Sequence, residues 1–146
     1  MDKVEALFLL KCHAFVHEDL EHEKMQHGFL GMLRPFRGEL DERNFHELMQ
    51  IIEVLAEEFE KPQVSRVIFS CFWSICQLAR SWAIYPDGML QRNRLISKEQ
   101  VGQMEEWLDM ISYAVMVLLE GEGQLDEALW EYREYLQKNI GDESSN

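Results

Sequence analysis

Three side chains that can bind metal ions recur at every fourth residue near the start of the chain: His13, His17 and Glu21. On a helix this spacing stacks them on one face, where two imidazole nitrogens and a carboxylate could bind a divalent metal ion. Such sites in helical bundles draw their ligands from several facing helices, but the sequence has no histidine after His46. A metal- or cofactor-holding bundle built on these three residues is therefore the alternative hypothesis, and we expect no bound cofactor.

The sequence lacks the short motifs that mark nucleophilic or metal-dependent catalysis. It has no G-x-S-x-G, no glycine-rich phosphate loop and no H-E-x-x-H. Its three cysteines, Cys12, Cys71 and Cys76, follow no ligand pattern, and the acidic start Met1–Glu5 is unlike a signal peptide. We therefore expect a cytoplasmic protein that is not an enzyme, with reduced thiols in its core.

The charge of the chain is strongly acidic and unevenly distributed. The net charge is −13, which argues against nucleic acid as a direct ligand because phosphate contacts need clustered Lys and Arg. Residues 1–60 hold 14 acids and 6 bases, residues 61–98 hold 1 acid and 6 bases, and residues 99–146 hold 12 acids and 2 bases. The uncharged run 67–79 is too short to span a bilayer, which needs about 20 residues, so we expect no membrane association.

The apolar residues recur at helical spacing throughout, which predicts an all-α fold. We expect a single-domain antiparallel bundle of about five helices over residues 1–140, with a central apolar helix at 64–84 and a disordered polar tail at 141–146. The other predicted helices span residues 3–27, 41–61, 97–120 and 124–138. Asp41 is a good N-cap, Ser97 and Gln100 have the spacing of a capping box, and Pro86-Asp87-Gly88 is a stop signal.

Two apolar features lie outside the main helical stripes. The segment Gly28–Gly38 combines five large apolar residues with two arginines. We expect Phe29, Leu33 and Phe36 to pack onto the bundle, because an open patch of that size invites aggregation; a partner-binding loop is the other interpretation. Trp73 falls beside charged and polar positions of its helix, and we expect it to be buried in the core.

The last two helices place aromatic residues on their acidic sides. Trp130, Tyr113 and Met116 point away from the predicted core stripes, toward carboxylates, and an aromatic anchor ringed by polar groups is typical of an interface hot spot. The predicted partner-binding residues are Trp130, Tyr113, Met116, Glu106, Asp109, Glu120, Asp126, Glu127 and Glu134. These features favour a small acidic intracellular protein that binds a basic partner protein. It could act as a stoichiometric inhibitor, such as a toxin-neutralising immunity protein or a nucleic-acid mimic, and the sequence leaves its oligomeric state open.

Overall fold

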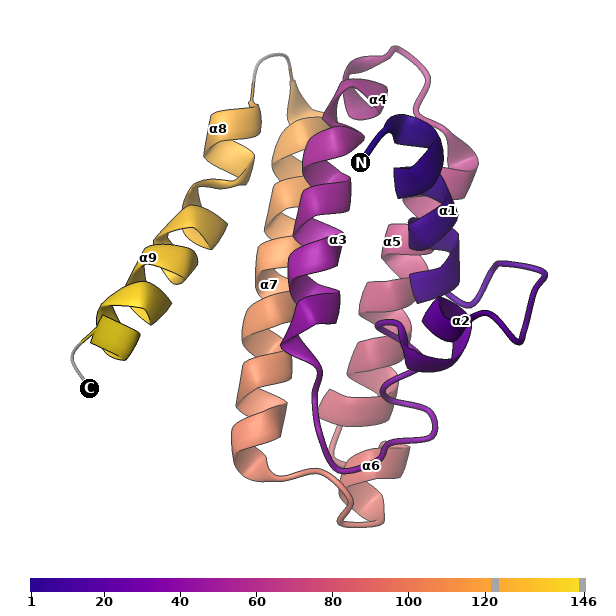
Figure 1. Ribbon diagram of the computed structural model, residues 1–146, viewed down its shortest axis with the longest axis vertical. Helices are drawn as coiled ribbons and strands as arrows, with labels where there is room; N and C mark the ends of the chain where they lie inside the picture. The colour runs from indigo at the N-terminus through magenta and orange to yellow at the C-terminus, as the bar shows by residue number, and fades with distance from the viewer. Residues whose placement is uncertain (122–123, 145–146) are drawn as a thin grey trace.

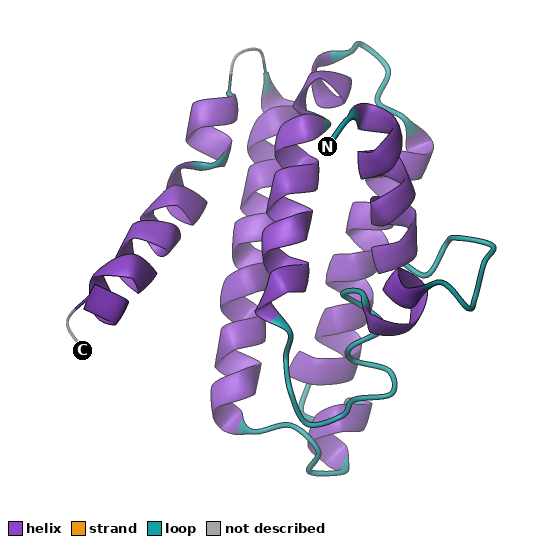
Figure 2. Ribbon diagram, viewed as in Figure 1, coloured by secondary structure: helices purple, strands orange, loops and turns teal. Residues whose placement is uncertain are grey.

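The computed structural model describes residues 1–121 and 124–144, and this part of the chain consists of helices and loops with no β-strand (Figure 2). The elements in chain order are α1 (Lys3–His13), α2 (Glu23–His27), α3 (Glu42–Val54), α4 (Ala56–Glu60), α5 (Arg66–Ala79), the π-helical turn η1 (Arg80–Ile84), α6 (Met89–Arg92), α7 (Lys98–Glu120), α8 (Leu125–Ala128) and α9 (Trp130–Ser144). The predicted all-α class is confirmed.

Four helices, α1, α3, α5 and α7, form two layers of two. In Figure 1, α1 and α3 lie in front of α5 and α7, and consecutive members of the four run in opposite directions. Each helix of the front layer contacts its neighbour in the rear layer, and the two helices within each layer contact each other. One hydrophobic cluster fills the space between the layers, so these helices belong to a single domain. The pair α8 and α9 lies beside α7 at the outer edge.

Side chains cap the helices where the sequence predicts it. The Asp41 carboxylate accepts a hydrogen bond from the backbone N–H of Arg43 at 3.0 Å, and Asp41 is the N-cap of α3. Ser97 and Gln100 form a reciprocal capping box at the start of α7. These contacts satisfy backbone donors that the first turn of a helix leaves without partners.

The prediction of one helix over residues 3–27 is wrong, because α1 ends at His13. Phe15 adopts a left-handed conformation with φ of 62°, and its N–H donates to the carbonyl of Cys12. The N–H of Val16 donates to the carbonyl of Lys11 at 2.8 Å, which completes a Schellman motif. This motif usually has glycine where Phe15 stands, and for this reason the sequence gives no sign of the stop.

Other predicted helices form with single-residue breaks. The helix predicted over residues 41–61 divides at Leu55, and the helix predicted over residues 124–138 divides at Leu129; both residues have φ near −95° and ψ near 0°. The chain then continues as α4 and as α9. Helix α9 extends to Ser144, into the segment 141–146 that was predicted to be a tail, and residues 145–146 lie outside the described part of the chain.

The central helix of the fold is α7, not the predicted helix at 64–84. Helix α7 contacts α3, α4, α5, η1 and α8, and most of its apolar residues are buried between them. Helix α5 has neighbours on only one side, and only 39% of the most apolar window within Arg66–Arg92 is buried. By length and composition alone that stretch could cross a membrane, a test that core helices of soluble proteins also pass. The predicted burial of Trp73 is wrong, because 64% of its surface is exposed.

The segment Gly28–Gly38 covers one end of the bundle, as predicted. Phe29 and Leu33 are completely buried, and Phe36 is partly buried against the core cluster. The guanidinium of Arg34 lies 5.3 Å from the centre of the Trp82 ring, in a cation–π contact. The large apolar side chains of this segment are thus used in packing, and they are not an open binding surface.

Candidate functional site

Helix α9 is attached to the bundle through a cluster of aromatic rings. Phe45 of α3 stacks on Trp107 of α7, with ring centres 5.3 Å apart and planes inclined by 7°. Tyr132 and Tyr135 of α9 meet Phe45 edge-on at 5.5 and 5.6 Å. Edge-to-face and offset-stacked rings interact favourably beyond the burial of their area, so this cluster sets where α9 lies.

Hydrogen bonds fix the orientation of the two tyrosines. The Tyr132 hydroxyl lies 2.6 Å from Nδ1 of His46. The Tyr135 hydroxyl donates to Oε1 of Glu42 at 2.8 Å and accepts from Nε1 of Trp107 at 3.4 Å. Burial raises the pKa of Tyr132 to about 12, so this hydroxyl is neutral at physiological pH. Helix α9 is therefore held at a defined distance from α3 and α7, with a groove on each side of it.

The groove between α7 and α9 is acidic. It has a volume of about 430 Å³ and is lined by Glu106, Glu131 and Glu134, together with Met110, Tyr135 and Lys138. None of the three glutamates forms an ion pair with another residue that the structure describes. We call this feature the acidic groove. Its carboxylates are free to interact with a positively charged ligand.

Tyr113 lies beside the acidic groove, among further carboxylates. Burial raises the pKa of Tyr113, and the charge and hydrogen bond of Glu127 raise it further, with smaller contributions from Glu131 and Glu120. These carboxylates come from α8, α9 and the end of α7. The negative potential of the acidic groove continues along α7 as far as this tyrosine.

The structure separates the predicted partner-binding residues into two groups. Glu106 and Glu134 line the acidic groove, with Tyr113 and Glu127 beside it, and Trp130 is 60% exposed at the first residue of α9. Asp109 is exposed on α7, and Asp126 pairs with Arg133 at 3.1 Å. Met116 and Glu120 belong to the second group and line a different groove, between α5 and α7, although the charge of Glu120 also reaches Tyr113.

The groove between α5 and α7 is apolar, and the sequence did not predict it. Its volume is about 540 Å³, and four of its large apolar side chains are exposed: Phe69 (39%), Trp73 (64%), Met116 (46%) and Leu119 (39%). The Phe69 and Trp73 rings stack with centres 5.8 Å apart. We call this feature the apolar groove. The displacement of Trp73 from the apolar stripe of its helix was the signal that could have revealed it.

The floor and ends of the apolar groove carry few polar groups. Arg80 donates to the Ser112 hydroxyl at 3.2 Å near one end, and Glu120 lies at the other end. The Cys76 sulfur lies 3.4 Å from the same hydroxyl, and burial raises the pKa of its thiol. A neutral thiol is a poor nucleophile, so Cys76 is not activated for nucleophilic attack.

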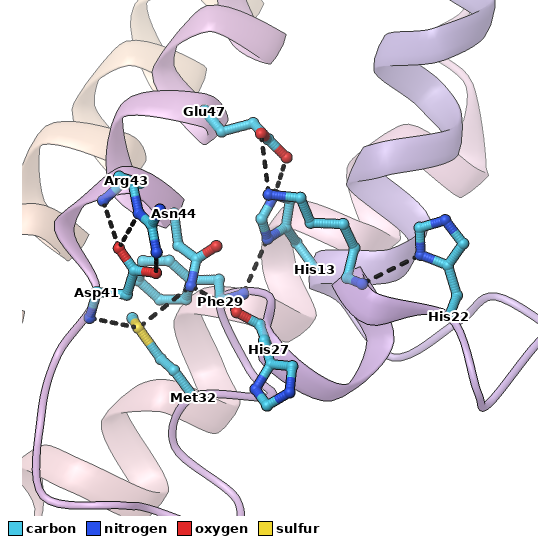
Figure 3. A network of polar contacts seen from close by, with 10 residues as sticks. His13, His22, His27, Phe29, Met32, Asp41, Arg43, Asn44 and Glu47 are labelled. Atoms are coloured by element: carbon cyan, nitrogen blue, oxygen red, sulfur yellow. Dashed lines mark hydrogen bonds and ion pairs between the residues drawn. The ribbon is translucent and has the colours of Figure 1, made fainter.

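His13 is completely buried and joins three segments of the chain (Figure 3). Its Nδ1 accepts a hydrogen bond from the N–H of Phe29 at 2.8 Å, and its Nε2 lies 2.8 Å from Oε1 of Glu47. Lys24 contacts the other carboxylate oxygen of Glu47 at 3.2 Å. The hydrogen bond from His13 holds the pKa of Glu47 below its usual value. Both nitrogens of the imidazole are engaged, which gives His13 a structural role.

The alternative metal site at His13, His17 and Glu21 does not assemble. Because α1 ends at His13, the three residues do not share a helical face. His17 instead accepts a hydrogen bond from the N–H of Asp19 at 3.0 Å and packs edge-on against Phe8. Within the part of the chain that the structure describes, no three His, Cys, Asp or Glu side chains are grouped so as to hold a metal ion.

Comparisons with protein-family models, with curated proteins and with solved structures give no match to this chain.

Proposed function

We propose that this chain is a small acidic binding protein that engages a basic segment of a partner protein along the acidic groove. The observation that carries the proposal is the position of Glu106, Glu131 and Glu134, which line one groove without ion-pair partners among the residues described. Trp130 is exposed on the same helix, one helical turn before Glu134, and supplies an apolar anchor beside this charge. Partners with complementary charge associate faster because the field guides their approach.

The other side of α9 supports this choice of groove. The groove between α3 and α9 has a volume of about 500 Å³ and is lined by Arg43 and Arg133 as well as Glu47 and Glu53. Its charges balance, so it would not select a basic ligand. The negative charge is concentrated on the α7 side of α9, so the proposed basic segment should bind on that side.

A protein of this kind could act as a stoichiometric inhibitor. Carboxylates on a rigid surface can cover the basic face of a nuclease or stand in for the phosphates that such a face binds. A toxin-neutralising immunity protein and a nucleic-acid mimic are the two forms that this proposal takes.

The experiment compares two double charge reversals of equal size. Glu127→Lys with Glu134→Lys changes the proposed surface, and Glu18→Lys with Glu60→Lys changes exposed residues on other elements. The wild type and each double variant are used to purify partners from the native organism. The association of each with the partner found is then measured by stopped flow at several salt concentrations. We expect the first variant to associate at least about tenfold more slowly and with a weaker salt dependence, because electrostatic steering acts mainly on the association rate.

Trp130→Ala tests the apolar anchor in the same assay. If Trp130 is a hot spot, its removal weakens binding by roughly 2 kcal/mol, or about 30-fold in the dissociation constant. If the two double variants associate at the same rate and Trp130→Ala leaves the affinity unchanged, the proposed surface is wrong.

A further inference from the structure

The apolar groove carries hydrophobic side chains that the packing of the monomer leaves exposed. Phe69 and Trp73 of α5 face Met116 and Leu119 of α7, and each exposes more than a third of its surface. In Figure 1 these helices form the rear layer of the bundle. Soluble monomers seldom expose contiguous apolar patches of this kind unless another molecule covers them.

The charges of the groove are the second observation. Among the residues that the structure describes, the charged members of its lining are Arg80 and Glu120, so this lining has no net charge although the chain carries −13. Two copies of such an acidic chain repel each other over most of their surfaces. The apolar groove is a face where this repulsion is weak.

The positions of the two charges are the third observation. Helices α5 and α7 are antiparallel (Figure 1), and the groove runs from Arg80 and Ser112 at one end to Phe69, Leu119 and Glu120 at the other. A twofold axis that reverses the direction of the groove brings Arg80 of one copy to the end occupied by Glu120 of the other, and the reverse. The surface is therefore complementary to itself, as the interface of a twofold-symmetric dimer must be.

We propose that the apolar groove is the interface of a homodimer, in which α5 and α7 of one copy pack on α5 and α7 of a second copy in the opposite direction. Trp73 and Met116, in the middle of the groove, are then buried across the interface, and Arg80 and Glu120 form pairs at both ends. The two grooves lie on different sides of α7, the acidic groove on its α9 side and the apolar groove on its α5 side. The dimer therefore leaves the acidic groove available, and this proposal is independent of the proposed function.

Analytical ultracentrifugation of the full chain tests this directly, from about 1 μM to about 1 mM, the range of weak to moderate affinities. We expect the wild type to pass from monomer to dimer as the concentration rises. Trp73→Ala should weaken dimerisation by at least about tenfold, as the loss of a buried aromatic anchor does. Trp130→Ala is the matched control, because it removes a similarly exposed tryptophan from another face and should leave the dimer unchanged.

Charge reversal tests the direction of packing. Arg80→Glu and Glu120→Arg should each weaken the homodimer, because each places like charges opposite one another at both ends. A mixture of the two single variants should form a heterodimer, since every facing pair then has opposite charge. The double variant should dimerise like the wild type. Circular dichroism of each variant shows whether it is folded.

Four outcomes would overturn the proposal. The wild type could remain monomeric throughout the concentration range. It could dimerise with Trp73→Ala having no effect, which would place the interface elsewhere. The mixed single variants could fail to associate although both are folded, which would exclude the reversed packing. Binding of an amphipathic peptide or a lipid vesicle to a chain that stays monomeric would assign the groove to another occupant and also overturn it.

Discussion

Replacing His13 with phenylalanine should destabilise the fold, because this imidazole satisfies polar groups of two other segments. His13 is completely buried, accepts from the N–H of Phe29 and hydrogen-bonds to Glu47, each at 2.8 Å. Phenylalanine fills most of the same space but offers no nitrogen. The variant therefore leaves a buried backbone donor without a partner and removes a bond between α1 and α3.

The magnitude follows from these two losses. A buried N–H left without a partner costs about 1–3 kcal/mol, and loss of the bond to Glu47 about 1 kcal/mol more. The second loss is limited, because the Glu47 side chain is 21% exposed and keeps its contact with Lys24. We expect a total of about 2–4 kcal/mol, which would lower the urea midpoint by about 1–2 M for a chain of this size.

Urea unfolding followed by circular dichroism at neutral pH measures the effect. His27→Phe is the control, since His27 is exposed and surface substitutions usually change stability by less than about 0.5 kcal/mol. His13→Asn should recover part of the loss, because its amide oxygen can accept from the N–H of Phe29. A His13→Phe variant as stable as the His27→Phe control, or a His13→Asn variant no more stable than His13→Phe, would refute this account of the site.

Two further predictions concern ionisation. Burial raises the pKa of Tyr132 to about 12, so the neutral phenol stabilises the fold fully below pH about 10, and this stability is lost as the pH rises toward 12. Urea midpoints measured over this range should fall less steeply for Tyr132→Phe, and equal slopes would contradict the assignment. Burial also raises the pKa of the Cys71 thiol to about 11, so labelling of Cys71 by a thiol reagent at pH about 8 should be slow in the folded chain and fast in urea; rapid labelling without urea would show that the thiol is accessible.

Features that depend on local chemistry could be predicted from the sequence. Asp41 and Ser97 cap helices because a short polar side chain can reach the free N–H groups of the next turn in any tertiary setting. The packing of Phe29 and Leu33 was predictable for a similar reason, since a soluble chain must cover large apolar side chains that lie close together.

The candidate grooves could be predicted only in part. The acidic side of α7 and the outward position of Trp130 follow from charge and helical spacing within one element. The separation of Met116 from Trp130 does not, because it depends on which neighbour each face of α7 meets. Met116 borders α5, whereas Tyr113 borders α8 and α9, and the spacing of the two residues along α7 carries no information about those neighbours.

The sequence by itself determined the helical class, the caps and the acidic character of the last two helices, since these depend on residue types a few positions apart. The tertiary structure decided which helix is central and which aromatic residues are exposed. Helical spacing shows that Trp73 lies off the main stripe, but its burial depends on whether another helix covers that side, and α5 has neighbours on one side only. The end of α1 was decided in the same way, because the contacts of His13 with Phe29 and Glu47 join residues 16 and 34 positions apart, beyond the reach of any local pattern.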